Sequence, residues 1–298
     1  MKRRKMKQVL IVGSGDVARR IIPWLAARFR VLAMTRRTEE CASLRALGAI
    51  PLVADLDLPD TLHRLAGLAD YVLHCAPPPA QGGDDPRTRR LLAALTRRGS
   101  LPRRISYIST TGVYGDCGGA WLDETRPLRP DSARAGRRVA AEARLRGFGR
   151  RTGCRVSILR APGIYDTDAR LPRARLLKGD PVLVAEEDVY TNHIHADDLA
   201  YLSALALFRG RPNRAYNATD DSTMRMGDYF DLVADACALP RPPRLPRAEL
   251  VDRLTPMTLS FMSESRRLKN DRIKREFRVR LLHPTVAAAL AASPPIAS

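Results

Sequence analysis

Segment 8–18, which reads QVLIVGSGDVA, constrains the fold more than any other part of the chain. Its first five residues are uncharged and suit a buried strand, and Gly13 and Gly15 follow them directly. From Val17 to Phe29, apolar residues recur every three or four positions, as on one face of a helix. The segment therefore predicts a strand, a tight turn and a helix at the start of the chain.

This turn suits the pyrophosphate of a dinucleotide for three physical reasons. Gly13 permits a sharp change of direction, and Gly15 leaves room for the phosphates to approach the backbone. The free N–H groups at the helix start then receive the phosphate charge. The predicted contacts in the turn are Gly13, Ser14, Gly15, Asp16 and Val17. An ordinary strand–helix connection is the alternative, because two glycines also occur in such turns.

The end of the second predicted strand, Val31–Thr35, indicates which dinucleotide is bound. An NAD site usually places Asp or Glu there to accept hydrogen bonds from the ribose hydroxyls, whereas arginine suits a 2′-phosphate. Here Arg36 and Arg37 follow the strand, and the first acidic residue is Glu39. We therefore expect NADP to be preferred over NAD. The alternative is that both arginines are solvated loop residues.

Strand-type and helix-type segments alternate along the chain. The expected strands are 49–54, 70–76, 104–109, 155–159 and 216–219, and the expected helices are 39–47, 59–68, 87–98, 196–208, 226–238 and 263–277. This alternation predicts an α/β fold with a doubly wound parallel sheet. Prolines 77–79 must turn the chain away at the carboxyl edge of that sheet, where ligands bind. Cys75, Ala76 and Pro77 are therefore candidate cofactor contacts.

Composition excludes several classes of protein. Hydrophobic residues make up 45% of the 298-residue chain, which predicts a globular protein of one large or two modest domains. No apolar run approaches the roughly 18 residues of a membrane span. The basic residues 1–7 precede only a short apolar run and are expected to form a solvated tail, not a signal peptide. Five scattered cysteines without a C-x-x-C pair indicate reduced thiols in a cytoplasmic protein and no metal site.

The net charge of +19 raises the alternative of nucleic-acid binding. The arginine excess is spread from end to end, which favours a compositional bias over a binding stripe. We therefore expect a small-molecule partner and no membrane or nucleic-acid partner. Three histidines, His74, His193 and His195, lie in strand-like segments and are expected to pack in the core.

Five motifs, in order along nearly the whole chain, resemble the extended short-chain dehydrogenase/reductase superfamily of NAD(P)-dependent nucleotide-sugar epimerases and dehydratases. They are GSGDVA at 13–18, ADL at 54–56, STTGVYG at 109–115, LRAPGIY at 159–165 and HIHADDLA at 193–200. The resemblance implies a Rossmann-type domain over residues 1–163, completed by 197–219. It also implies a smaller, mostly helical substrate lobe over residues 164–196 and 220–298, in a monomer or homodimer.

The resemblance also implies roles for single residues. Asp55 and Leu56 take the adenine side of the cofactor. Ser109, Ala161 and Pro162 would contact the cofactor at two later strand ends. Thr110 holds the place of the catalytic Ser or Thr, and Thr111 would help it to bind a substrate oxygen. From the residues alone, these hydroxyls suit either a substrate oxygen or the capping of a turn.

The family's reactive Tyr-x-x-x-Lys pair is missing. Anchoring on Glu142 puts Arg134 at the tyrosine place and Arg138 at the lysine place. The reaction needs a phenol that passes a proton near neutral pH, and arginine cannot do this because its pKa exceeds about 12 and it accepts no hydrogen bond. Arg138 can still bind the nicotinamide ribose and supply positive charge. Tyr114 is the nearest phenol, although it is not the family's acid.

Two functions from different classes follow. The first is an NAD(P)-dependent oxidoreductase or epimerase/dehydratase that acts on a nucleotide-sugar-like or carbonyl substrate by hydride transfer. The second is a non-catalytic, NADP-sensing regulatory protein, which the lost tyrosine and lysine favour.

Overall fold

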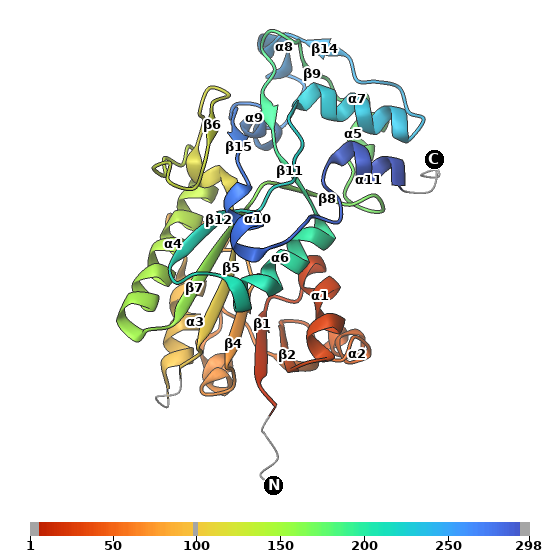
Figure 1. The fold of residues 1–298 in the computed structure, drawn as a ribbon. Helices are drawn as coiled ribbons and strands as arrows, with labels where there is room; N and C mark the ends of the chain where they lie inside the picture. Colours follow the sequence, from red (N-terminus) through yellow and green to blue (C-terminus); the bar gives the residue numbers. More distant parts are fainter. Residues whose placement is uncertain (1–5, 98–100, 293–298) are drawn as a thin grey trace.

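A computed structural model describes residues 6–97 and 101–292 of the chain. Within them, seven strands form one parallel sheet, which occupies the lower part of Figure 1. They are β1 (Gln8–Val12), β2 (Arg30–Thr35), β3 (Ile50–Val53), β4 (Tyr71–His74), β5 (Arg104–Thr110), β7 (Arg155–Ala161) and β12 (Arg214–Asn217). The spatial order is β12-β7-β5-β4-β1-β2-β3, so the predicted doubly wound sheet is confirmed.

Helices cover both faces of this sheet. One face packs against α1 (Asp16–Ala26), α2 (Cys41–Ala46) and α6 (Ala196–Arg209), and the other against α3 (Pro86–Thr96) and α4 (Ala133–Thr152). Strand β1 shows why its last four residues, 9–12, are all apolar. Val9 and Ile11 join the core beneath α1 and α6, whereas Leu10 and Val12 join the core beneath α3 and α4.

A smaller lobe stands above the carboxyl edge of the sheet (Figure 1). Its strands are β8 (Gly163–Tyr165), β9 (Val182–Leu183), β10 (Tyr190–Thr191), β11 (His193–His195), β13 (Met224–Arg225) and β14 (Arg244–Leu245). Its helices are α5 (Arg173–Leu177), α7 (Met226–Ala236), α8 (Arg247–Leu250), α9 (Pro256–Phe261) and α11 (Val286–Ala292). Its core contains Val233, Leu250 and Val286.

The segment after α9 returns to the sheet. β15 (Arg267–Leu268) pairs with β6 (Trp121–Leu122), and α10 (Asp271–Phe277) packs beside β12. Ile273 and Phe277 of α10 share a core with Tyr216 of β12. The C-terminal part of the chain therefore contacts both the lobe and the sheet.

Two predicted helices differ from the structure. The expected helix 59–68 is the 3-10 helix η2 (Pro59–Leu65), which still buries Leu62 and Leu65. The expected helix 263–277 is wrong in its first half, because helix α10 begins only at Asp271. The N–H groups of Arg267 and Lys269 donate to the carbonyls of Ala120 and Leu122 at 3.0 Å, so strand pairing uses the donors that a helix would need.

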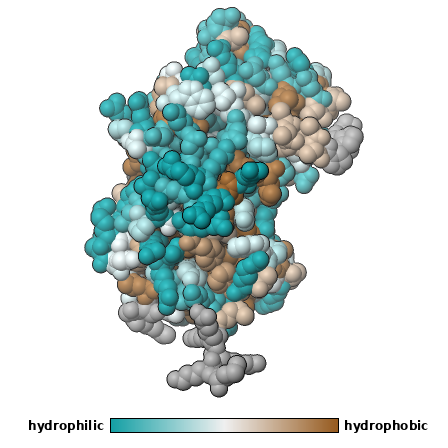
Figure 2. Space-filling model, in the orientation of Figure 1, coloured by the Kyte–Doolittle hydropathy of each residue, from teal (hydrophilic) through white to brown (hydrophobic). Residues whose placement is uncertain are grey.

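Among the described residues, no helix is both long and apolar enough to cross a membrane. Figure 2 shows a face on which hydrophilic residues cover most of both the sheet region and the lobe, with apolar residues in small patches.

Candidate cofactor groove and adjoining cavity

The turn between β1 and α1 has the geometry that its glycines predict. Gly13 has φ +92°, and a Cβ there would lie 2.7 Å from the backbone nitrogen of Ala76, so only glycine fits. A Cβ on Gly15 would meet nothing within 4 Å. The Ser14 hydroxyl donates to the Met34 carbonyl at 2.5 Å and holds the turn against β2. The space above Gly15, at the start of α1, is therefore open.

A groove of about 590 Å³ extends from this turn along the carboxyl edge of the sheet. Most of the predicted cofactor contacts line it together: Gly13, Ser14, Gly15, Asp16, Val17, Arg36, Arg37, Asp55, Leu56, Cys75, Ala76, Pro77 and Arg138. Burial raises the pKa of the Cys75 thiol to about 12, so this groove residue stays neutral. The structure thus brings together residues from five separate segments of the sequence.

Three predicted contacts lie elsewhere. Ser109 is buried, and its hydroxyl donates to Glu142 Oε1 at 2.7 Å, so it faces the interior between β5 and α4. Ala161 is buried at the end of β7. Pro162 lines a neighbouring cavity and not the groove.

An acidic side chain stands near the end of β2, although the sequence places none at 33–37. Glu40 accepts a hydrogen bond from the Thr35 hydroxyl at 2.6 Å and pairs with Arg37. The hydrogen bond from Thr35 and the charge of Arg37 lower the pKa of Glu40. Within the described part of the chain, no carboxylate forms an ion pair with Arg36, in contrast to Arg37, although the charge of Arg36 contributes to lowering the pKa of Asp57.

A second cavity of about 780 Å³ lies between the sheet edge and the lobe. It shares Pro77, Arg138, Ile164 and Arg170 with the groove, so the two spaces adjoin. Thr110 and Thr111 line it, as predicted for substrate-binding hydroxyls. Thr110 Oγ1 also accepts a hydrogen bond from the Gly112 N–H at 3.3 Å, so it caps the 3-10 helix η4 (Thr111–Tyr114). The capping interpretation therefore holds for Thr110, and binding of a substrate oxygen stays a prediction that its place in the cavity wall permits.

Tyr114 lies outside the cavity lining and is 1% exposed. Its hydroxyl accepts a hydrogen bond from Arg160 at 2.9 Å and donates one to Asn217 Oδ1 at 2.7 Å. Burial raises its pKa to about 12, the opposite of what proton transfer near neutral pH requires. This geometry argues against the candidate catalytic role of Tyr114.

Helix α4 brings three arginines to the cavity. Residues three and four apart share a helix face, so Arg134, Arg137 and Arg138 point to the same side. The Arg138 guanidinium donates to the Tyr107 hydroxyl at 3.0 Å and to the Ile108 carbonyl at 2.7 Å. The Arg134 guanidinium lies 4.4 Å from the centre of the Phe261 ring.

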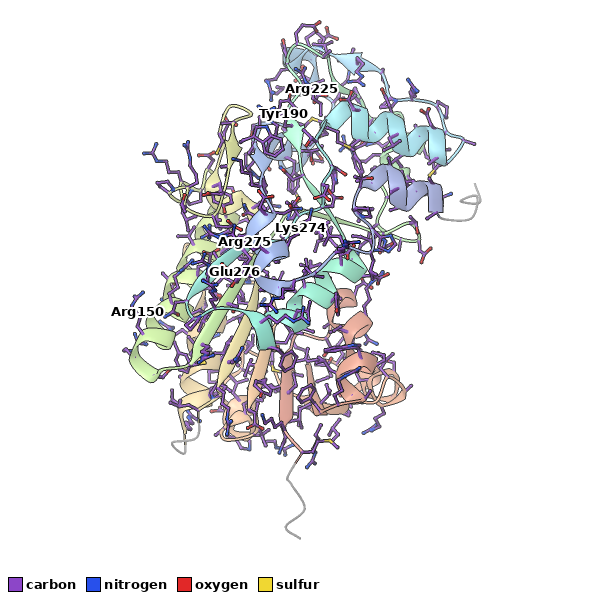
Figure 3. The ribbon with its side chains drawn as sticks, viewed as in Figure 1. Arg150, Tyr190, Arg225, Lys274, Arg275 and Glu276 are labelled. Atoms are coloured by element: carbon purple, nitrogen blue, oxygen red, sulfur yellow. The ribbon has the colours of Figure 1, made fainter. Side chains whose placement is uncertain are left out.

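Much of the cavity wall comes from the segments that the resemblance assigned to the substrate lobe, at single residues that the sequence analysis did not name. They contribute Tyr190, Thr191, Asn192, Met226, Met257, Ser260, Phe261, Glu264 and Arg266. In Figure 3, Tyr190 and Arg225 lie together in the lobe. The Arg225 guanidinium is 5.6 Å from the centre of the Tyr190 ring. No local motif marks these positions, because they meet only after the lobe has folded.

The three strand histidines are buried, as expected. His74 Nε2 is 3.0 Å from the Thr88 hydroxyl, and burial lowers the pKa of His74 to about 3. One potential metal-ligand atom from each of His195, Asp197 and His283 lies within 4.8 Å of the other two, a spacing that would suit a metal ion. However, His195 Nδ1 accepts a hydrogen bond from the Asp197 N–H, and the Asp197 carboxylate pairs with Arg20 at 2.8 Å.

Comparison with known proteins gives a family and several similar structures. Residues 9–219 match the NAD dependent epimerase/dehydratase family. A search of curated proteins finds no match. A functionally unknown conserved protein from Silicibacter pomeroyi is 31% identical, with a TM-score of 0.79 over 96% of this chain and 97% of that one.

Two solved structures support the fold alone. UDP-glucose 4-epimerase from Thermotoga maritima is 17% identical, with a TM-score of 0.76 over 95% of this chain and 96% of that one. A dTDP-glucose 4,6-dehydratase from Streptomyces venezuelae, solved with NAD, is 19% identical, with a TM-score of 0.74 over 96% of each chain. Dinucleotide binding is typical of this family. Because the family model covers most of the sheet and its carboxyl edge, the chain belongs to the NAD-dependent epimerase/dehydratase family.

Proposed function

We propose that this protein binds NADP in the groove and a small-molecule substrate in the cavity, as an oxidoreductase with an atypical active site. One observation carries the proposal: the groove and the cavity adjoin and share Pro77, Arg138, Ile164 and Arg170. Two ligands bound in these spaces would therefore meet. When bound, the nicotinamide supplies or accepts hydride.

The residues of the groove fit a dinucleotide. The open space above Gly15 is one that a side chain would fill, and it adjoins the free N–H groups at the start of α1. These donors and the helix dipole suit a pyrophosphate. Arg138, already fixed by Tyr107 and Ile108, has further guanidinium donors for a ribose hydroxyl.

The proton chemistry of this site differs from that of a tyrosine–lysine pair. Arg134 and Arg138 hold positive charge but cannot pass a proton. Thr110 and Thr111 line the cavity and can donate a hydrogen bond to a substrate oxygen. We therefore expect tight cofactor binding with slow or undetectable turnover of common nucleotide-sugar and carbonyl substrates. The presence of arginines at the places of the family's tyrosine and lysine also favours the second candidate, a non-catalytic protein that senses NADP.

Gly15→Val tests the cofactor site. Gly15 has φ −72° and ψ −175°, which valine adopts without strain, so the variant should fold while its side chain fills the pyrophosphate space. We expect NADP(H) and NAD(H) binding to be lost in calorimetric titrations. Gly136→Ala on α4 is the control, because its Cβ also meets nothing within 4 Å and lies outside the groove.

Wild-type protein that binds neither cofactor, or a Gly15→Val variant that binds as tightly as wild type, would exclude the proposal. A panel of carbonyl compounds, assayed for NADPH oxidation across pH, separates the two candidates. Turnover supports the enzyme. Retained cofactor binding without turnover on the panel favours the sensor.

A further inference from the structure

The α4 wall of the cavity carries unneutralised positive charge. Two other cavity arginines have carboxylate partners: Arg170 pairs with Asp16 at 3.1 Å and Arg266 with Glu264 at 2.7 Å. Within residues 6–97 and 101–292, no carboxylate pairs with Arg134, Arg137 or Arg138. Their contacts are to neutral groups, namely an aromatic ring, a phenol and backbone carbonyls.

Among these arginines, Arg137 is buried, so its uncompensated positive charge is energetically unfavourable. It is only 7% exposed, and within the described part of the chain the one hydrogen bond of its guanidinium runs from Nη1 to the Gly82 carbonyl at 2.8 Å. A charge removed from water is unfavourable unless a partner of opposite charge compensates for it. A guanidinium that is buried, faces a cavity and has only a carbonyl partner is therefore suited to an anionic ligand.

The cofactor does not account for this charge. Arg138 lines both the groove and the cavity, so it can serve the dinucleotide. Arg134 and Arg137 line the cavity alone. Their anion must therefore belong to the second ligand.

The other residues of the cavity wall indicate what the part of this ligand beyond its anionic group is like. The cavity also has an apolar surface, to which Pro78, Met226, Met257 and Phe261 contribute, and Phe261 lies directly against Arg134. The hydroxyls of Thr110 and Thr111 line the same cavity. A ligand with an oxyanion and an apolar body would satisfy both kinds of surface.

We propose that Arg134 and Arg137 bind the carboxylate or phosphate of an organic anion with an apolar body, which is the substrate of this site. The proposal rests on the proposed function, because it concerns the cavity beside the cofactor groove. Arginine presents paired N–H donors that match two oxygens of either oxyanion. In this protein, the arginine at the family's tyrosine place thus recognises substrate charge and does not transfer protons.

Titrations of the NADP-loaded protein with three probes test the proposal: phenylpyruvate, phenyl phosphate and the neutral ketone benzylacetone. We expect at least one anion to bind, and the neutral ketone to bind about tenfold to hundredfold more weakly, as for the loss of a charge-assisted pair. The two anions separate a carboxylate site from a phosphate site. Raising the salt concentration should weaken only the anions.

Arg134→Gln and Arg137→Gln should each weaken the preferred anion by a similar factor and leave the neutral ketone unchanged. Arg134 is exposed, so its variant remains informative even if Arg137→Gln fails to fold. Arg150→Gln is the matched control, because Arg150 lies near the C-terminal end of the same helix (Figure 3) and does not line the cavity. It should bind the anion like wild type.

Three results would overturn the proposal: neither anion binds at millimolar concentration, the neutral ketone binds equally well, or both cavity variants bind the anion like wild type. NADP titrations of the same samples distinguish a failure of the anion proposal from a failure of the proposed cofactor binding. Anion binding that depends on Arg134 in a protein that binds no NADP would refute the cofactor assignment and leave the anion site intact.

Discussion

Arg138 stands at the place where the resemblance expects a lysine, and we propose that its guanidinium performs part of that lysine's function. Its guanidinium donates hydrogen bonds to the Tyr107 hydroxyl and the Ile108 carbonyl, and its Cζ lies 5.6 Å from the centre of the Tyr107 ring. A lysine offers one compact ammonium, whereas the planar fork of arginine keeps donors free after two are used. If the groove binds the dinucleotide as we propose, Arg138 keeps a positive charge beside it but does not supply the proton relay of the family.

Arg36 should decide between NADP and NAD. Arg37 already pairs with Glu40, so Arg36 is the cation available for a 2′-phosphate. Arg36→Ala should weaken NADP binding about tenfold to hundredfold, the effect of losing a charge-assisted bond, and leave NAD binding unchanged. Arg37→Ala should have a smaller effect. Calorimetric titration with both cofactors measures the ratio, and tighter binding of NAD than NADP by wild type would contradict the assignment.

Tyr114 should matter for stability and not for turnover. Tyr114→Phe leaves Arg160 and Asn217 without their shared partner in the interior, which should lower the free energy of unfolding by about 1–3 kcal/mol. Turnover of any carbonyl substrate should stay unchanged. Tyr190→Phe is the comparison, because Tyr190 lines the cavity. Urea unfolding and NADPH oxidation measure the two effects, and robust turnover that Tyr114→Phe abolishes would show that this phenol is the acid after all.

Strands β4 and β11 place three histidines where they stay neutral. Burial lowers the pKa of His74 and His193 to about 3 and that of His195 to about 4, below the ordinary 6.5. Between about pH 4 and 6.5 the unfolded chain therefore binds up to three protons that the folded protein does not, and stability falls as the pH falls. Asp220 acts in the opposite direction, because burial raises its pKa to about 7.

His193→Gln should remove one proton from this difference. The slope of unfolding free energy against pH should then fall by about 1.4 kcal/mol per pH unit near pH 5, relative to wild type. Urea unfolding at several pH values measures the slope, with the exposed His63→Gln as the reference. An unchanged slope in His193→Gln would mean that His193 is protonated in the folded protein.

The elements near the sheet edge were predictable because each carries a local signal. Gly13 and Gly15 mark the turn, and alternating strand and helix patterns give the parallel sheet. The first half of the helix expected at 263–277 does not form, because the donors of Arg267 and Lys269 are used by β6, a strand more than a hundred residues away in sequence. Tyr190 and Phe261 were missed for the same reason: their place in the cavity depends on tertiary contacts.

At the scale of the whole molecule, one buried network joins the sheet to the C-terminal segment. Glu142 and Arg160 pair at 2.8 Å, Arg160 holds the Tyr114 hydroxyl, and Tyr114 holds Asn217. The Asn217 side chain then donates to the Lys269 carbonyl at 3.0 Å. Residues of α4, β7, η4 and β12 are thus linked to the chain between β15 and α10. The sheet region and the C-terminal segment, which both border the cavity, are therefore held together by hydrogen bonds.

The position of β12 at one end of the sheet has a consequence for synthesis of the chain as well as for the folded structure. Lobe segment 163–192 precedes β12 in sequence, so β7 is synthesised long before its outer neighbour. Until Asn217 has emerged from the ribosome, the growing protein presents the bare edge of β7, a surface that invites pairing with other chains. A product truncated before Arg214 would keep that edge permanently, which makes it a natural target for chaperones and proteases.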